Sequence, residues 1–355
     1  MQLPERVSLP LPLEEFSEII DVRSPSEFAE DHIPGAINLP VLSDEERHEV
    51  GLINASNAFE SRRLGATLVT KNIHRHLAET LADRPREYAP LIYCWRGNMR
   101  SNSTATILRA IGWRARVIQG GYKAWRKWLM ADLDEQISKP QPELIVLAGL
   151  TGCGKTRLLH ALKEQGAQVL DLEGHAHHKG SILGNPANGS QPAQKLFETS
   201  LWHDFSNFDP SHPVFTEAES NRIGKLQLPG SLWRRLGMAR VALVSLPLAE
   251  RAKFLAADYP HFVEDPQRLK DTLDGLRRLR GHAQIDQWHA QIDQADWTTF
   301  LESILLNHYD VVYRKPGSED SIYQDPEDHL HLEKFTESTF TDGAAELIKR
   351  FSSVT

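Results

Sequence analysis

The sequence predicts an α/β protein of two domains, the second of which is a doubly wound parallel sheet with a helical C-terminal part. The chain has 355 residues, more than one hydrophobic core usually supports. An apolar run at 144–148 precedes a glycine-rich turn and an amphipathic pattern at 157–162, in the order strand, turn, helix. Further strand patterns at 168–171, 214–216 and 241–246 alternate with helical patterns. This alternation indicates a parallel sheet with helices on both faces.

The composition is that of an ordinary globular protein. Hydrophobic residues make up 40% of the chain and charged residues 25%, and no run approaches the roughly 20 apolar residues of a membrane span. The two cysteines, Cys94 and Cys153, are too few for a disulfide framework and fit a reducing compartment. Because the segment 1–6 also lacks the apolar core of a signal peptide, we expect a cytoplasmic protein that contacts no membrane.

Positive charge is concentrated in one segment, although the net charge of the chain is −8. Between Arg84 and Trp128 there are ten Lys or Arg residues and a single acid, Glu87, together with four of the eight tryptophans. We call residues 84–128 the basic segment. Clustered positive charge with interleaved aromatic residues is typical of nucleic-acid binding.

The N-terminal part alternates short strands and helices. A strand ends at Asp21, and a helical turn capped near Ser24 or Ser26 follows. The loop 32–38 leads into an extended piece, and the stretch 43–63 is polar. The remaining elements are a helix at 70–82, strands at 91–93 and 115–118 with a helix at 101–111 between them, and a helix after Gly120 and Gly121.

Cys94 occupies a position that favours reactivity. It ends the strand 91–93 and lies in a loop that opens onto a helix, so it faces backbone N–H groups and the positive end of a helix dipole. Arg96 and Arg100 add positive charge, so we expect the thiolate to form below the usual pKa of about 8.5. Such a sulfur can attack as a nucleophile or carry a transferable sulfur or selenium. The alternative is a buried, inert cysteine.

Residues 15–128 resemble a rhodanese domain. The resemblance rests on Asp21-Val22-Arg23, on His32-Ile33-Pro34-Gly35-Ala36, on the loop from Cys94 to Arg100 with five residues between the two, and on Gly120-Gly121 before Ala124-Trp125. It implies that Cys94 carries sulfur or selenium as a persulfide-type adduct, cradled by the following N–H groups and assisted by Arg96 and Arg100. Trp125 matches a core position of that family.

The boundary between the domains is indicated by a polar, proline-bearing stretch that contains Ser138-Lys139-Pro140-Gln141-Pro142. We therefore assign 1–133 to the first domain, 134–142 to a linker and 143–355 to the second domain. In the second domain, helical patterns at 266–281, 284–293 and 296–306 are followed by an acidic, poorly patterned stretch at 317–336 and a last helix at 344–351.

The turn after 144–148 has the spacing of a phosphate-binding P-loop, GxxxxGKT, from Gly149 to Thr156. Gly149, Gly152 and Gly154 allow a tight turn that aims N–H groups inward, and the helix N-terminus favours an anion. Lys155 is expected to reach the outer phosphate, and the Thr156 hydroxyl to help hold Mg²⁺.

Acidic side chains follow two other strands of the same sheet. Glu173 comes after the strand 168–171, and Glu217 and Glu219 come after 214–216. Paired acids there can hold Mg²⁺ through water or act as a base, and Arg222 can meet phosphate, although a solvated charged turn explains the pattern equally well. His175, His177 and His178 fit none of the usual zinc spacings, so we predict no resident metal.

A rhodanese-like domain followed by a P-loop domain is similar to the tRNA 2-selenouridine synthase family. Family-like segments include Leu172-Glu173-Gly174 and Glu217-Ala218-Glu219-Ser220. The resemblance implies a transferase that acts on the wobble 2-thiouridine of tRNA. It implies S-geranylation from geranyl diphosphate in the P-loop domain, and then replacement of the sulfur by selenium from selenophosphate at Cys94. These are co-substrates, so no tightly bound cofactor is expected; an enzyme that makes selenophosphate is an expected partner.

The anticodon loop of tRNA is expected to lie on the basic segment. Trp95, inside the Cys94 loop, can stack on a splayed base. The candidate phosphate contacts are Arg114, Arg116, Arg126 and Lys127. Two other functions stay open: an ATP-dependent tRNA sulfurtransferase whose P-loop domain activates the uridine, and a non-catalytic sulfur or selenium carrier gated by a nucleotide. The pairing of Lys155 and Thr156 with the nearby acids argues against the carrier.

Overall fold

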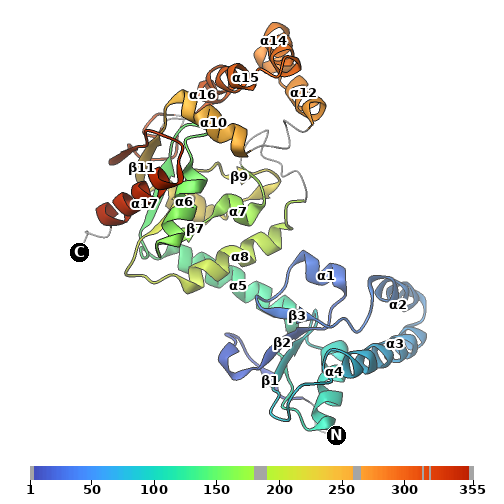
Figure 1. Cartoon of the computed structure of the whole chain (residues 1–355). Helices are drawn as coiled ribbons and strands as arrows, with labels where there is room; N and C mark the ends of the chain where they lie inside the picture. The colour runs from blue at the N-terminus through green and yellow to red at the C-terminus, as the bar shows by residue number, and fades with distance from the viewer. Residues whose placement is uncertain (1–3, 180–189, 259–264, 314–315, 320, 352–355) are drawn as a thin grey trace. The chain divides into compact units, whose positions relative to one another are not determined.

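The computed structural model describes residues 4–179, 190–258, 265–313, 316–319 and 321–351 (Figure 1). The chain divides into two compact units. Unit 1 comprises Met1–Glu135 and Pro192–His203, and unit 2 comprises Gln136–Gln191 and Asp204–Thr355. Each unit is built on a five-stranded parallel sheet flanked by helices, which confirms the predicted α/β class. Among the described residues, no helix combines the length and apolarity needed to cross a membrane.

The sheet of unit 1 has the order β1-β5-β4-β2-β3. Its strands are β1 (Arg6–Val7), β2 (Glu18–Asp21), β3 (Ala36–Asn38), β4 (Pro90–Tyr93) and β5 (Arg116–Ile118). Its helices are α1 (Pro25–Glu30), α2 (Asp44–Ser56), α3 (Ala58–Ala78), α4 (Met99–Ile111) and α5 (Gly121–Ser138). All four residues of β4 are buried, so Cys94 directly follows a buried central strand.

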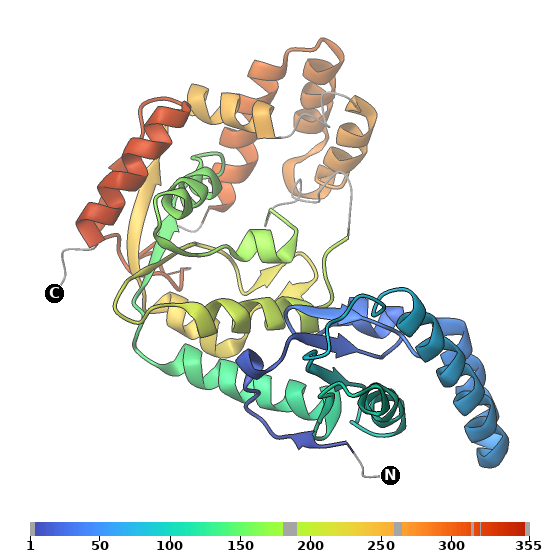
Figure 2. The same ribbon diagram turned by 60° about the horizontal axis from the view of Figure 1, so that its bottom comes forward.

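Helices α2 and α3 occupy much of the stretch 43–63, for which the sequence shows no apolar period. Their ends carry the signals instead: Ser43 and Glu46 form a capping box, and Asn57 accepts from the N–H groups of Phe59 and Glu60. Helix α2 buries none of its residues. It packs beside α3, as Figures 1 and 2 both show. A helix that faces solvent on most of its surface has no reason to display a hydrophobic stripe.

Helix α5 continues to Ser138, so the stretch 134–142 that the sequence assigns to a linker is helical over its first half. The segment 192–203, within the range assigned to the second domain, packs in unit 1. It opens α8 (Gln194–Asn207), and Trp202 donates a hydrogen bond of 2.8 Å to Asp132 Oδ2. The Trp202 ring also meets Trp125 and Trp128 edge to face. Three indole rings therefore hold this segment in unit 1.

The sheet of unit 2 has the order β12-β11-β6-β8-β7. Its strands are β6 (Leu144–Ala148), β7 (Gln168–Leu170), β8 (Val214–Glu217), β11 (Arg240–Ser245) and β12 (Asp328–His331). A two-stranded ribbon, β9 (Arg222–Ile223) and β10 (Leu226–Gln227), stands apart. The helices are α6 (Lys155–Glu164), α7 (Leu172–Ala176), α9 (Gly230–Gly237), α10 (Leu248–Asp258), α12 (Pro266–Asp274), α13 (Arg277–Arg280), α14 (His282–Asp293), α15 (Trp297–Ile304), α16 (Asp310–Val312) and α17 (Glu337–Phe351).

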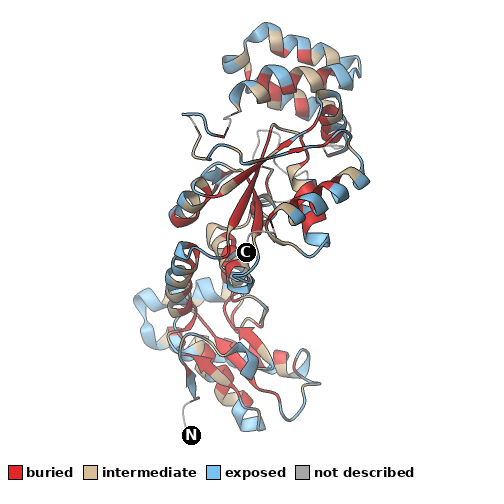
Figure 3. Ribbon diagram, turned by 90° about the vertical axis from the view of Figure 1, so that its left-hand side faces the viewer, coloured by how far each residue is buried: buried red, intermediate tan, exposed pale blue. Residues whose placement is uncertain are grey.

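Buried residues, coloured red in Figure 3, gather on the strands of this sheet. All five residues of β6 are buried. Strand β12 lies in the stretch 317–336, where no strand is predicted from the sequence. It is an edge strand beside β11, and only Leu330 of its four residues is buried. An edge strand of this kind lacks the apolar run by which a central parallel strand is recognised.

Candidate active sites

The Cys94 loop links β4 to α4, as the sequence predicts. Cys94 is buried, with 3% of its surface exposed, and its Sγ lies 3.3 Å from Ser101 Oγ in the first turn of α4. Helix α4 begins at Met99 after Asn98. The sulfur therefore lies beside the amino end of a helix of 13 residues, where backbone N–H groups favour negative charge.

Glycines on both sides fix the path of this loop. Gly97 has φ of 63° and Gly121 has φ of 60°, both in the left-handed region. A Cβ added at Gly121 would collide with the carbonyl oxygen of Cys94 and with the nitrogen of Gly97. Tyr122 N donates a hydrogen bond of 2.9 Å to Cys94 O. The start of α5 thus holds the main chain of the candidate reactive cysteine in place.

The two arginines of the loop have different surroundings. Arg96 is exposed. Arg100 Nη1 lies 2.9 Å from Glu27 Oε2. Burial alone would raise the pKa of Glu27, but the hydrogen bond and charge of Arg100 outweigh it and hold that pKa below its usual value. Arg100 is therefore shared between Glu27 and the loop, and Arg96 is the more accessible cation beside Cys94.

The candidate tRNA contacts fall into two groups. Arg114 and Lys127 are exposed. Arg116 pairs with Glu15 at 2.8 Å. Arg126 contacts Asp31 at 3.7 Å and pairs with Glu198 of α8. The Arg126 side chain is only 13% exposed and its charge is paired inside unit 1, so a contact with the phosphate backbone of tRNA stays a prediction.

Trp95 has a structural partner of its own. It is half-buried, and its ring stacks on Tyr122 with centroids 5.3 Å apart and planes 29° apart. Lys195 Nζ lies 5.9 Å from the centroid of the Trp95 ring. One face of Trp95 is thus taken by Tyr122, so stacking on a base stays a prediction for its other face.

The phosphate loop of unit 2 joins β6 to α6. Gly149, Gly152 and Gly154 have φ values of 154°, 80° and 84°. A Cβ at Gly154 would collide with the ring of Phe340 on α17, and a Cβ at Gly149 with Val244 O. Lys155 Nζ donates a hydrogen bond of 2.9 Å to Gly149 O. The loop thus forms a tight glycine-rich turn at the amino end of a helix, which is the geometry that binds phosphate in P-loop proteins.

The predicted acids converge on this loop. A cavity of about 200 Å³ is lined by the P-loop and by Glu173, Glu217 and Glu219. Thr156 Oγ1 lies 3.2 Å from Glu173 Oε2, and Glu217 Oε1 accepts a hydrogen bond of 2.8 Å from Glu173 N. The carboxyl ends of β7 and β8 meet at the same edge of the sheet as the end of β6, which is where ligands bind in such folds.

Burial and mutual repulsion change the acidity of these groups. Burial, followed by the charge of Glu173, raises the pKa of Glu219 to about 8. Burial and the nearby charges of Asp171 and Glu173 raise the pKa of Glu217 well above its usual value. Burial alone would lower the pKa of Lys155, but the surrounding anionic groups outweigh it and raise that pKa. Lys155 therefore stays cationic beside acids that resist full ionisation.

A hydrated cation fits this cavity better than a protein-only metal cage does. No group of three His, Cys, Asp or Glu side chains in the described part of the chain is arranged to hold a metal. Glu217 Oε2, however, is buried without a hydrogen-bond partner among the described residues, and Thr156 is adjacent to Glu173. Mg²⁺ commonly binds one or two carboxylates together with water and substrate phosphate. The donor set suits such an ion.

Arg222 and the three histidines do not line the cavity at the phosphate loop. The Arg222 Nε donates to Gly224 O at 3.0 Å, and Arg222 does not line the cavity. His175 Nε2 contacts Asp204 Oδ2 at 2.5 Å, whereas His177 ends α7 in the left-handed conformation. His178 is buried, and burial lowers its pKa. The histidines thus face different surroundings.

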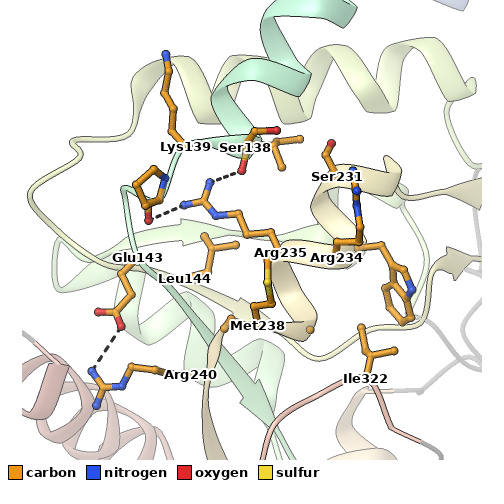
Figure 4. A pocket seen from close by; sticks show the side chains of 15 residues that line it. Ser138, Lys139, Glu143, Leu144, Ser231, Arg234, Arg235, Met238, Arg240 and Ile322 are labelled. Carbon is orange, nitrogen blue, oxygen red and sulfur yellow. Dashed lines mark hydrogen bonds and ion pairs between the residues drawn. The ribbon is translucent and has the colours of Figure 1, made fainter.

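A larger cavity, of about 970 Å³, lies at the amino ends of the strands in the sheet of unit 2 (Figure 4). Glu143 and Leu144, at the beginning of β6, and Arg240, at the beginning of β11, line it. Arg235 donates to Ile137 O at 3.0 Å, and Arg240 lies 3.7 Å from Glu143. This cavity is at the amino ends of the strands, so it lies away from the phosphate loop and is not a candidate active site.

Several residues at the phosphate loop were not singled out from the sequence. Tyr313 lines the cavity from a distant part of the chain, and Phe254 and Leu255 line it from α10. No motif marks any of them. Lys179, which follows His175, His177 and His178 in the sequence, also lines the cavity.

Comparison with known proteins identifies relatives of both units. The description "tRNA 2-selenouridine synthase AAA domain" matches residues 142–324, and a rhodanese-like domain matches residues 8–127. A tRNA 2-selenouridine synthase of Chromohalobacter salexigens is 33% identical over 357 residues, covering 93% of each chain. One of Alcanivorax borkumensis is 32% identical, covering 83% of this chain and 88% of that protein. A solved rhodanese-related protein from Thermoplasma volcanium is 18% identical with a TM-score of 0.24, covering 35% of this chain and 92% of that one.

Proposed function

The chain belongs to the tRNA 2-selenouridine synthase family, and we propose that it exchanges the sulfur of a wobble 2-thiouridine in tRNA for selenium in two chemical steps. The sulfur is first alkylated by geranyl diphosphate at the phosphate loop of unit 2. The S-geranyl uridine then reacts with selenophosphate at the Cys94 loop of unit 1. The observation that supports this proposal is that each unit has a candidate site of its own, the glycine-rich phosphate loop in unit 2 and the Cys94 loop in unit 1.

The first step is an attack of the thiocarbonyl sulfur on C1 of geranyl diphosphate, with diphosphate as the leaving group. The leaving group gains negative charge as the C–O bond breaks, and Lys155 with the N–H groups of the loop neutralises that charge. Lys155 Nζ lies 2.9 Å from Gly149 O, and its neighbours Cys153 and Glu173 outweigh burial and raise its pKa, so the positive charge is positioned before the reaction. Thr156, Glu173 and Glu217 would hold a hydrated Mg²⁺ there, which supplies further charge neutralisation.

The second step replaces the alkylated sulfur. Selenium of selenophosphate attacks C2 of the uridine, geranylthiol departs as a neutral molecule, and hydrolysis of the Se–P bond leaves 2-selenouridine and phosphate. An unalkylated thiocarbonyl sulfur is a poor leaving group. Alkylation converts it into a group that can depart as a neutral thiol. Cys94 and the N–H groups at the start of α4 position the selenium donor, and Arg96 meets its phosphate.

The partners follow from the substrates. The anticodon loop of tRNA supplies the uridine, and a selenophosphate-producing enzyme supplies the selenium donor. Because tRNA and the selenium donor are both available in the cytoplasm, the reaction is proposed to take place there.

Mass analysis of a 2-thiouridine tRNA after incubation with the full-length protein tests this function. Geranyl diphosphate alone is expected to give the S-geranyl nucleoside, and later addition of selenophosphate is expected to give the selenouridine. The chief alternative is an ATP-dependent tRNA sulfurtransferase. A requirement for stoichiometric ATP hydrolysis, with no geranylated product, would establish that alternative.

A further inference from the structure

An apolar cavity of about 690 Å³ lies in unit 1, between helices α2, α3 and α4. Its apolar walls are formed by Leu42, Val50, Leu52, Val69, Ile73 and Met99. Leu52 and Met99 are 63% and 64% exposed, so two large apolar side chains meet solvent at this cavity. The volume falls in the range of small-ligand pockets.

The cavity is next to the Cys94 loop. Met99, Arg100 and Ser103 line it from the first turns of α4, and Ser101 of the same turn contacts Cys94 Sγ at 3.3 Å. Residues 99, 100 and 103 share one face of the helix, because side chains three and four positions apart are neighbours. The cavity and the candidate reactive sulfur therefore lie on two sides of a single helical turn.

The charged residues at the cavity are all basic. Arg47, Arg62 and Arg100 line it, and no acidic residue is among the described residues that do. Glu27, which is not part of the lining, pairs with Arg47 at 3.2 Å and with Arg100 at 2.9 Å, whereas Arg62 is exposed. An apolar interior beside basic residues matches a ligand that joins a hydrocarbon to an anion, as an alkylated nucleotide within RNA does.

We propose that this cavity binds the geranyl group of the S-geranyl uridine while the C2 atom is held at Cys94. The inference rests on the proposed function, which supplies the alkylated intermediate. Arg100 lines the cavity, and Ser101, the next residue, contacts Cys94 Sγ, so only the first turn of α4 separates the cavity from the sulfur. The cavity selects the alkylated tRNA over the 2-thiouridine tRNA and holds the geranylthiol as it departs.

Gly65 on α3 offers a clean way to fill the cavity. A Cβ at this position meets only Val50 Cγ1, at 3.6 Å, which is ordinary contact. Replacing a helical glycine also raises helix propensity, so Gly65→Leu is expected to fold. Gly51→Leu fills the cavity from α2, where a Cβ meets nothing within 4 Å. Thr67→Leu, exposed on α3 and not part of the cavity, is the matched control.

The test compares the affinities of the full-length variants for anticodon stem-loops that carry 2-thiouridine, S-methyl or S-geranyl 2-thiouridine. In the unaltered protein, the geranyl group is expected to tighten binding at least about tenfold over the methyl group. That preference is expected to fall to near unity in Gly65→Leu and Gly51→Leu and to persist in Thr67→Leu. If the preference for the geranyl group survives in both Gly65→Leu and Gly51→Leu, the inference is overturned and the geranyl group binds elsewhere. The absence of any such preference in the unaltered protein also overturns it.

Two further readouts separate this inference from its alternatives. If the unaltered protein does not convert the S-geranyl tRNA with selenophosphate, the proposed function itself fails. If it does convert that tRNA but shows no geranyl preference, only the cavity assignment fails. Sedimentation of Gly65→Leu is expected to match that of the unaltered protein. A change of oligomeric state would identify the cavity as a contact between copies of the chain and overturn the inference.

Discussion

Thr156 Oγ1 and Glu173 Oε2 lie 3.2 Å apart, and this contact joins the phosphate loop to the segment that follows β7. Thr156 is in α6 and Glu173 is in α7, the helices that follow β6 and β7, and these two strands are not neighbours in the sheet because β8 lies between them. Together with Glu217, both residues line the cavity that Lys155 also lines. Lys155 supplies positive charge there for a diphosphate, and the carboxylates are candidate ligands of Mg²⁺.

Lys155→Ala is expected to lower the rate of S-geranylation. A charge-assisted contact to the leaving diphosphate is worth about 1.5–3 kcal/mol, so the rate should fall roughly ten- to a hundredfold. The measurement is the amount of S-geranyl nucleoside formed from 2-thiouridine tRNA. Selenation of a tRNA that is already geranylated should be unaffected, and an equal fall in the rates of both steps would contradict the assignment of Lys155 to the first.

Cys94→Ser is expected to abolish incorporation of selenium and to spare geranylation. The serine hydroxyl is close in size to the thiol, so Ser101 keeps a partner and the loop is expected to retain its shape. Nucleoside analysis should show S-geranyl uridine accumulating in place of selenouridine. If geranyl transfer disappears as well, while circular dichroism shows a folded protein, the two steps do not have separate sites.

Gly121→Ala is expected to distort the Cys94 loop. The added Cβ would collide with Cys94 O, and the residue would also be strained at φ of 60°. Gly35→Ala is the matched control, because Gly35 has φ of 77° but a Cβ there meets nothing within 4 Å. The rate of selenation should fall at least about tenfold further in the first variant than in the control. Equal effects of the two substitutions would show that backbone strain alone, and not the contact with Cys94, matters.

Local motifs explain why much of the two sites could be predicted. The phosphate loop and the Cys94 loop are defined by spacing within eight and seven residues, and the acids at 173, 217 and 219 follow strands whose ends must meet. Tyr313 could not be found in this way, because only tertiary folding brings it to Lys155. The surroundings of Arg126 could not be predicted either, because only tertiary folding places Asp31 and Glu198 beside it.

The fold was predictable to a similar extent. Buried central strands such as β6 carry a continuous apolar run, whereas the edge strand β12 does not. Helix α2 and the first part of α3 could be found only through the caps at Ser43 and Asn57, whereas the second part of α3 overlaps the helix predicted at 70–82. The two helices also form the apolar cavity, which depends on packing between helices and leaves no periodic trace in the sequence.

His76 is expected to make the stability of unit 1 depend on pH. Its Nε2 lies 2.9 Å from Pro40 O, and burial lowers its pKa. The unfolded chain, with a His pKa of about 6.5, then binds a proton more readily than the folded chain. Neutral His76 therefore stabilises the folded state fully above about pH 6.5. Its contribution to the free energy of unfolding is lost as the pH falls below that value. His76→Gln, which cannot be charged, should therefore lose less stability than the unaltered protein in denaturant titrations between about pH 7 and 5. Parallel losses would show that His76 is not the group responsible.

Binding of tRNA is expected to depend on the exposed cations of the basic segment. Arg116 and Arg126 are engaged in ion pairs, so their removal would test stability rather than RNA binding. The double variant Arg114→Gln with Lys127→Gln is the sharper test, since both side chains are exposed.

Removing these two charges should weaken binding and reduce the slope of log K against log salt concentration by roughly 0.7 for each phosphate that is no longer neutralised. Arg268→Gln with Arg278→Gln removes the same charge from exposed positions in unit 2 and is the control. Filter binding of tRNA across a salt series measures both slopes. The reverse pattern, an unchanged slope in the first variant and a smaller one in the control, would place the RNA backbone on the arginines around α13 instead of on the basic segment.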